Sequence, residues 1–401
     1  MTVITTAPLL RQTISELVAL RDPEGILSIY VDAGAQRGNR HRPRAGEIAL
    51  RRGLESLRAD LDAEGRRERT RLLEARLAES AGSLADLVDP TRPGRGRALV
   101  VPLSGGSPVE VRTTRPMGDR VVFAPTACAT PLLGPLAESD TAGVASLGGE
   151  GVRVVEVRAD GAEEVLRAPY GIPSDDWRPM VGPARATPGH PQESESQRDL
   201  FARRLEEHRT RRVREIAAAV WQEAARRGWE RLAVTGSGER VRALQETRPP
   251  DGPPILVLGV QLSHEAAPEM LRGAVAGPLA DARRRTGREL AEHLRDEALA
   301  AAGRAVVGLD DTLGTLFEGR VERLVLDAAA RHEGALAPDG RMVVAGEIPP
   351  GVAPSELVPE PHLVERMIEC ALATGAALVV LEGPAAEPLA PFGGVAAALR
   401  W

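Results

Sequence analysis

Short apolar runs alternate with helical stretches along this chain, and that alternation limits the possible folds more than any other feature. The runs at residues 26–32, 97–103 and 321–327 have the length and β-branched content of buried strands, and Gly or Pro residues lie near their ends. Helical periodicity of apolar residues follows at 47–61 and 66–88. Because alternating strands and helices form layered folds, and 401 residues exceed one ordinary core, we predict an α/β protein of three units.

The predicted units cover residues 1–138, 139–270 and 271–401. The middle unit contains a proline-rich polar segment at 172–196 that leads into an arginine-rich helix at 197–227. A stretch of this length without periodicity is typical of a functional loop. The other predicted elements are a hairpin or meander around Gly148-Gly149, strands at 109–113, 120–125, 230–236, 255–260, 341–346 and 376–382, and helices at 279–302 and 361–374.

The residue types present exclude several kinds of chemistry. The chain has no lysine, which excludes Schiff-base catalysis and a Walker-type phosphate loop. Its seven histidines form no HxxxH or HxH pair, and Cys128 and Cys370 lie far apart, so we expect no metal ion and no other cofactor. Gly236-Ser237-Gly238 lacks the third glycine of a dinucleotide motif and is interpreted as a strand–helix turn. Asp310-Asp311 is interpreted as a helix N-cap.

No apolar run is long enough to cross a membrane, and the first residues lack the basic and apolar regions of a signal peptide. We therefore expect a cytoplasmic protein without a membrane partner. The formal net charge of −6 argues against non-specific coating of nucleic acid, so we expect no DNA partner.

The charge is nevertheless unevenly distributed. Residues 37–71 hold 11 Arg against six acids, whereas residues 345–401 hold two Arg against seven acids. Residues 37–44 read RGNRHRPR and contain no acid. This composition fits an RNA-contacting loop tip about as well as an unstructured loop. The candidate RNA contacts in this loop are Arg37, Arg40, His41, Arg42 and Arg44.

The arginine-rich helix supplies a second set of candidate RNA contacts. Residues 198–231 hold ten Arg and six acids, and guanidinium groups bind phosphates through forked contacts. The spacing also fits a solvated helix with Glu–Arg pairs four residues apart, which is the favoured interpretation on spacing alone. The candidates in this set are Arg198, Arg203, Arg204, Arg211 and Arg212.

Three segments, in order, resemble the archaeo-eukaryotic class-one release factors and Pelota, and more closely their bacterial relatives. FAPTACATPLLGPLAESDTAGVASLGGEGVRVVEV is similar to the junction of the first and middle domains. QRDLFARRLEEHRTRRVREIAAAVWQEA, with ERLAVTGSGE, is similar to the long helix and strand after the catalytic loop. FEGRVERLVLD, AALVVLEG and PFGGVAAALRW are similar to the C-terminal domain, which has the fold of kink-turn-binding ribosomal proteins. The resemblance implies a three-domain release-factor architecture, with a first domain of the kind that reaches the decoding centre.

The chain departs from that family at the catalytic loop. Release factors present Gly-Gly-Gln there, but this chain reads PGHPQESESQRD. Gly189 and Gln192 keep a G-x-x-Q remnant, Gln197 falls near the aligned glutamine, and His190 is a further candidate RNA contact. Nearby glutamates would repel the phosphates of a tRNA end. No stop-codon-reading motif is present either, so the comparison implies no codon-dependent termination and no catalytic residue.

Among the bacterial relatives, the pattern looks like the Balon-type ribosome hibernation factors, which lack both motifs. That resemblance implies a stress-response protein that binds rRNA in the ribosomal A site and associates with elongation factor Tu. The acidic balance of residues 345–401 fits a protein partner better than RNA. Two alternatives stay open: a codon-independent peptidyl-tRNA hydrolase that uses the G-x-x-Q remnant, and a non-catalytic Pelota-like rescue adaptor.

Overall fold

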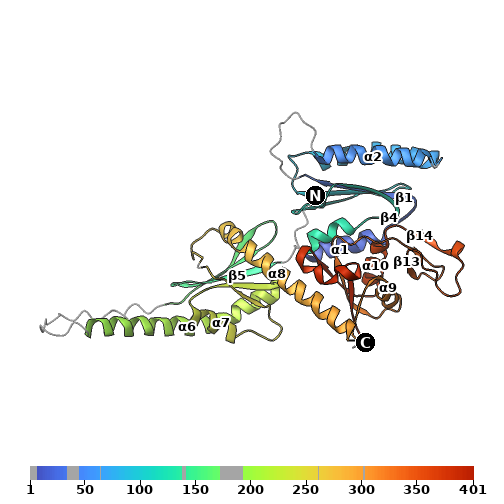
Figure 1. Ribbon diagram of the computed structural model, residues 1–401. Coiled ribbons are helices and arrows are strands. Elements are labelled where there is room, and N and C mark those ends of the chain that lie inside the picture. The colour runs from blue at the N-terminus through green and yellow to red at the C-terminus, as the bar shows by residue number, and fades with distance from the viewer. Residues whose placement is uncertain are drawn as a thin grey trace. The chain divides into compact units, whose positions relative to one another are not determined.

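The structure is a computed structural model that describes residues 7–33, 45–63, 65–137, 141–171, 193–260, 262–300 and 303–401, with backbone alone for 7–8, 137 and 193–201. The chain forms two compact units, one of Met1–Ser139 with Arg283–Trp401 and the other of Asp140–Ala282 (Figure 1). Both units pack helices against β-sheets, which confirms the predicted α/β class. No helix in the described ranges is long and apolar enough to span a bilayer.

The N-terminal part of the first unit is a four-stranded antiparallel sheet in the order β3-β2-β1-β4. Its strands are β1 (Arg21–Asp32), β2 (Gly96–Pro102), β3 (Val109–Thr113) and β4 (Arg120–Thr126). Alternate residues of β1 enter two different cores. Leu27 and Ile29 face α2 (Ala45–Ala63), α3 (Arg67–Glu79) and α4 (Ala81–Val88), whereas Ile26 and Tyr30 face the opposite way. Both faces of the sheet are covered, which explains why residues 26–31 of β1 form an almost continuous apolar run.

The prediction of a single helix at 66–88 is wrong, because the chain turns at Ser80 and forms two helices. The Ser80 N–H still donates to the Arg76 carbonyl, while Ser80 itself is buried between α3 and α4. This turn changes which residues face the sheet. Leu73 and Leu77 of α3 are buried, and so is Leu87 of α4, whereas Ala81, four residues after Leu77, is exposed.

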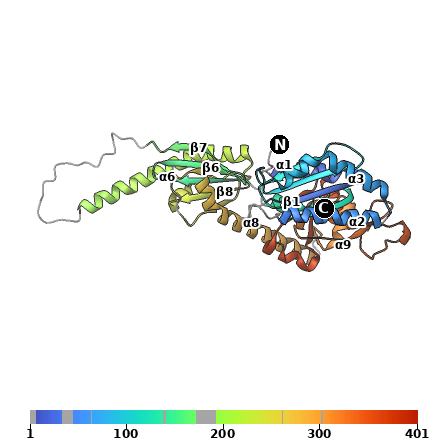
Figure 2. The same ribbon diagram turned by 90° about the horizontal axis from the view of Figure 1, so that it is seen from above.

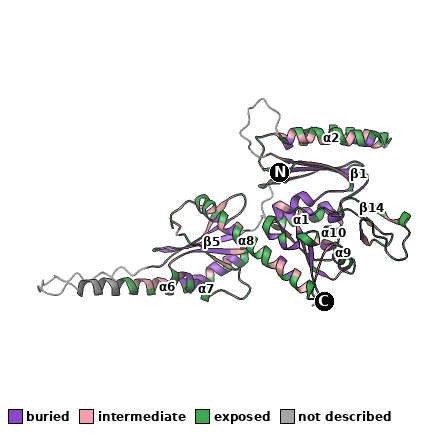
Figure 3. Ribbon diagram, viewed as in Figure 1, coloured by how far each residue is buried: buried purple, intermediate pink, exposed green. Residues whose placement is uncertain are grey.

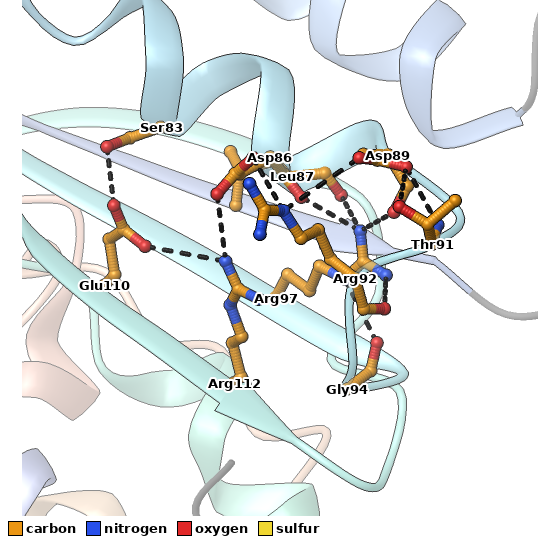
Figure 4. Close-up of polar contacts among 10 residues, drawn as sticks. All are labelled: Ser83, Asp86, Leu87, Asp89, Thr91, Arg92, Gly94, Arg97, Glu110 and Arg112. Atoms are coloured by element: carbon orange, nitrogen blue, oxygen red, sulfur yellow. Dashed lines mark hydrogen bonds and ion pairs between the residues drawn. The ribbon is translucent and has the colours of Figure 1, made fainter. Parts of the chain in front are cut away.

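Arg97 fixes the end of α4 from inside the core (Figure 4). Its side chain is 1% exposed, and its guanidinium donates to the carbonyls of Asp86, Leu87, Asp89, Arg92 and Gly94 at 2.5 to 3.1 Å. These are the free carbonyls of a helix C-terminus and of the loop after it. Because they supply partial negative charge, they stabilise the buried cation.

We expect Arg97→Met to lower the free energy of unfolding by about 2 to 3 kcal/mol, since five backbone carbonyls lose a charged donor. Chemical denaturation of the full chain measures this loss. Arg92→Met is the matched control, because Arg92 is exposed and its ion pair with Asp86 contributes at most about 1 kcal/mol. An equal loss in both variants would contradict the role assigned to Arg97.

The C-terminal part of the first unit contains two sheets. The larger has the order β10-β16-β11-β15, with β11 and β15 parallel, and the smaller has the order β13-β12-β14. The strands are β10 (Ala305–Val307), β11 (Val321–Asp327), β12 (Gly334–Leu336), β13 (Met342–Val344), β14 (Val358–Glu360), β15 (Ala377–Leu381) and β16 (Val395–Leu399), with helices α9 (Leu309–Phe317) and α10 (Leu363–Ala373). Asp310 and Asp311 lie in the first turn of α9, whose N-cap is Gly308, so the predicted N-cap role is wrong. Their charges stabilise the positive end of the helix dipole instead.

The N-terminal and C-terminal parts share one hydrophobic core. Leu10, Ile14 and Leu17 of α1 (Ala7–Ala19) belong to the same buried cluster as Met367 and Ile368 of α10. α5 (Leu133–Ala137) and the 3₁₀ turns η1 (Thr130–Leu132), η2 (Pro354–Glu356), η3 (Gly383–Ala385) and η4 (Glu387–Phe392) complete the unit. The division into domains 1–138 and 271–401 stays a prediction, but the residues of both pack as one body here.

The second unit is a five-stranded mixed sheet in the order β7-β6-β5-β8-β9. The strands are β5 (Ala142–Leu147), β6 (Gly151–Val157), β7 (Ala162–Pro169), β8 (Arg231–Gly236) and β9 (Ile255–Val257). β5 and β6 form the hairpin predicted around Gly148-Gly149. One face packs on α6 (Glu193–Arg227) and α7 (Gly238–Glu246), and the other packs on the start of α8 (Pro268–Leu299).

The predicted start of the helix at 279–302 is wrong, because α8 begins at Pro268 and continues through Pro278. Proline costs a helix one backbone hydrogen bond and usually ends it. Here Leu271, Val275 and Leu279 are buried on one side of α8 against the sheet, so packing outweighs that cost.

Candidate functional site

The long helix α6 has a packed part and a projecting part. Val213, Ala217, Val220 and Ala224 recur at helical spacing and are buried against the sheet. The 35 residues of α6 span about 50 Å, and both views show its N-terminal part extending past the strands of its unit (Figure 2). Buried residues lie along the part beside the sheet (Figure 3). The projecting part is therefore a helix segment surrounded by solvent.

Most arginines of α6 form ion pairs within the unit. Arg203 pairs with Glu207 at 3.2 Å, and Arg214 pairs with Glu246 of α7 at 3.0 Å. Arg226 and Arg227 share Glu223, and Arg209 pairs with Glu206. Most of the positive charge counted in the sequence is thus compensated, as expected for a helix with Glu–Arg pairs.

Arg204 and Arg211 differ from these arginines. Both are exposed, and neither has an ion-pair partner among the residues that the structure describes. They lie seven residues apart, which is two helical turns, and Val213 is two and a half turns from Arg204. Both arginines therefore face away from the sheet of their unit. They are the two described candidates best placed to contact an external phosphate.

Arg212, another predicted RNA contact, is occupied by an intramolecular bond. Its Nε donates to the Tyr170 carbonyl at 3.1 Å, and the His208 ring lies 3.4 Å from the same oxygen. Tyr170 follows β7 and is fully buried. Arg212 and His208 therefore connect the end of β7 to α6 through contacts with this carbonyl.

The side chains of the remaining predicted site residues lie outside what the structure describes. Gln197 and Arg198 lie in α6, where only the backbone is described. Outside the described residues lie Arg37, Arg40, His41, Arg42, Arg44, Gly189, His190 and Gln192. Of the two predicted sets, the structure describes only residues of α6.

A cleft that the sequence did not indicate lies between α2 and the sheet of the first unit. Its volume is about 500 Å³. Leu57, Leu61, Val121 and Phe123 form apolar walls, and Arg66, Arg69 and Asp60 supply charge. Aromatic rings and guanidinium planes both stack on nucleobases, so the cleft has the size and chemistry for a small aromatic group. Only the packing of α2 and the start of α3 beside β4 brings these residues together, and no local motif signals it.

The described residues offer neither a metal centre nor an activated thiol. Across the described ranges no group of three or more His, Cys, Asp or Glu side chains could hold a metal ion. Burial raises the pKa of the Cys128 thiol to about 12 and also raises the pKa of Cys370. Both thiols are therefore protonated at neutral pH and are poor nucleophiles.

The acidic balance of residues 345–401 is largely compensated inside the unit. Glu360 and Glu369 both pair with Arg366, Glu387 pairs with Arg288, and Glu365 is buried in the core. Much less negative charge is thus free on the surface than the count of seven acids indicates. The expected preference of this region for a protein partner loses part of its basis.

The middle of the chain is similar to a known protein family. Residues 140–250 match the model of bacterial archaeo-eukaryotic release factor family 5, and this range contains α6, α7 and the sheet from β5 to β8. The match spans less than half of the chain. This match agrees with the release-factor resemblance of the two segments quoted above from residues 123–157 and 197–239. It does not distinguish the hibernation factors from other bacterial relatives. No curated protein matches the chain.

Several solved structures match the chain at low similarity. Archaeal Pelota, in a model of ribosome-bound Pelota and ABCE1, is 12% identical with a TM-score of 0.41, and the match covers 98% of this chain and 94% of Pelota. The archaeal translation termination factor aRF1 is 13% identical with a TM-score of 0.23, covering 99% and 98%. Dom34 of S. cerevisiae is 10% identical with a TM-score of 0.40, covering 74% and 72%. All three TM-scores lie below 0.5, which is too low to define the fold of the whole chain.

Proposed function

We propose that this protein binds the bacterial ribosome, occupies the A site of an idle ribosome and hydrolyses nothing there. The observation that carries the proposal is the pair Arg204 and Arg211, exposed on the outer side of α6 in the unit that matches a bacterial release-factor family. Their guanidinium groups are free to neutralise rRNA phosphates. The basic loop at 37–44 would add contacts from the first unit.

The proposed mechanism is steric. Residues 1–138, 139–270 and 271–401 would correspond to the first, middle and C-terminal domains of a release factor, the last with the kink-turn-binding fold. A molecule of this kind in the cytoplasm would exclude tRNA from the A site during stress. We further propose elongation factor Tu as a protein partner, supported by the family resemblance more than by the surface charge. Cryo-electron microscopy of ribosomes from stationary-phase cells tests the position of the protein directly.

We expect peptidyl-tRNA hydrolysis to stay at background when this protein is added to ribosomes with an empty A site. No Gly-Gly pair precedes Gln192 or Gln197, so the backbone lacks the freedom that brings a glutamine and its water to the ester. Glu193 and Glu195 add repulsion toward the tRNA phosphates.

A competent release factor on the same ribosomes is the positive control. Turnover above background that disappears in Gln192→Ala or Gln197→Ala would establish the hydrolase alternative and remove the non-catalytic proposal.

A further inference from the structure

The projecting part of α6 has no apolar anchor. Among its described side chains, residues 202–212, none is buried, and the first buried residue is Val213. A helix segment this short is only marginally stable in water without packing. Beyond the backbone hydrogen bonds that continue from the packed part of the helix, polar contacts are therefore what resist its bending relative to the sheet.

Two groups of polar contacts meet this part of α6, and Glu206 is the centre of the first. One carboxylate oxygen of Glu206 accepts from the Ser237 hydroxyl at 2.6 Å and from Arg240 Nε at 2.8 Å. Arg240 also donates to the carbonyls of Leu147, at 2.6 Å, and Gly148. The Arg240 side chain is 12% exposed and that of Glu206 is 24% exposed, so water competes weakly for these bonds. These charged hydrogen bonds thus join α6 to the N-terminus of α7 and to the end of β5.

The second group acts on the other side of the helix. His208 follows Glu206 by two residues, which turns its side chain roughly to the opposite side of α6. His208 and Arg212 contact the Tyr170 carbonyl at the end of β7. α6 is therefore held from two sides just before it leaves the sheet.

The charge state of Glu206 fits this role. Burial acts to raise the pKa of its carboxyl, but hydrogen bonds from Ser237 and Arg240 and the charges of Arg240 and Arg209 outweigh that effect, so the pKa is lowered. The carboxylate is ionised at neutral pH and accepts charge-assisted bonds, which are shorter and stronger than neutral ones.

We propose that Glu206 and Arg240 are positioning residues that set the direction of the projecting part of α6, and with it the place where Arg204 meets its partner. The proposal rests on the function proposed above, because a fixed direction matters only if α6 is presented to a large rigid surface. Residues 193–206 span about 20 Å, so a small change of angle at Glu206 moves the tip by several ångströms. Such a displacement exceeds what a preorganised binding site tolerates.

The test measures the distribution of distances between α6 and β7 in the free, full-length protein. Spin labels are attached through Arg203→Cys on α6 and Glu163→Cys on β7, both exposed and in the same unit, in a Cys370→Ser background. A narrow distance distribution is expected without further change, and a clearly broader one with Glu206→Gln or Arg240→Gln. Glu207→Gln is the matched control, because the only described ion-pair partner of this neighbouring carboxylate is Arg203, which the label already replaces, so the width is expected to stay unchanged.

Two outcomes would overturn the proposal: an unchanged width in Glu206→Gln, or equal broadening in Glu207→Gln. Loss of the whole fold is recognised separately from the hydrogen exchange of residues 213–224, which is expected to stay slow in all variants. Ribosome binding is measured afterwards on the same proteins. If the native protein does not bind ribosomes but the widths change as expected, the functional proposal fails and the positioning role stands.

Discussion

Replacement of Glu365 by alanine is expected to destabilise the first unit by about 3 to 5 kcal/mol, because it leaves three buried donors without their acceptor. Glu365 is 4% exposed on α10, and its carboxylate accepts the backbone N–H groups of Ala129 and Thr130, both at 2.8 Å, and the Thr130 hydroxyl. These partners lie more than 230 residues earlier in the chain. One carboxylate therefore joins the two parts of the unit.

Chemical denaturation of the full chain measures the loss of stability. Glu365→Gln is expected to lose less, since an amide oxygen still accepts one or two of the bonds. Glu369→Ala, four residues further along α10, is the control. Its side chain is 35% exposed, and its ion pairs contribute at most about 1 kcal/mol.

Hydrogen exchange on the Glu365→Ala variant shows how far the effect spreads. If the two parts share one core, protection is expected to fall in β1 and α1 as well as in α10 and β11. A loss confined to the C-terminal part, or a loss as small as that of the control, would mean that the two parts are independent domains. The result also bears on the architecture, since independent first and last domains are what the release-factor resemblance implies.

Much of the strand pattern could be predicted from the sequence. β3 and β11 fall at the predicted residues, because β-branched runs between turn residues are a local signal. β16, Val395–Leu399, was not predicted, since three of its five residues are alanine and carry no strand preference. The break at Ser80 and the early start of α8 escaped prediction for a related reason. In both cases tertiary packing decides where a helix begins or ends.

The candidate site could be predicted in kind but not in detail. Arginine count and spacing indicated that α6 is a basic helix, and spacing also indicated its Glu–Arg pairs. The pair of Arg214 with Glu246 and the bond of Arg212 to the Tyr170 carbonyl join residues that are 32 and 42 positions apart. No local pattern records such contacts. Only the folded unit therefore distinguishes the two uncompensated arginines from those already paired.

The largest effect on function is expected from removing the uncompensated arginines together with the basic loop. If the four loop arginines and the two on α6 each contact a phosphate, affinity for vacant ribosomes is expected to fall by about 10³ between 50 and 200 mM salt. Replacing all six with alanine should reduce the slope of log affinity against log salt by about four to five. The substituted residues are Arg37, Arg40, Arg42, Arg44, Arg204 and Arg211.

Co-sedimentation with purified ribosomes over a salt series measures both quantities. Arg204→Ala with Arg211→Ala alone is expected to reduce the slope by about 1.4 to 1.8, which separates the helix from the loop. The matched control is Arg214→Ala with Arg226→Ala. It removes the same charge from the same helix at positions that are already paired with Glu246 and Glu223. Because those arginines are compensated, the control is expected to change the slope little.

The comparison of these two double variants decides whether position or total charge governs binding. If the helix acts only through its net charge, both doubles weaken binding equally, and the outward direction of Arg204 and Arg211 has no special role. If the exposed arginines meet phosphates, only their double variant reduces the slope. An unchanged slope in the folded six-residue variant would remove both the loop and α6 from the interface. The ribosome-binding proposal would then lose the observation on which it depends.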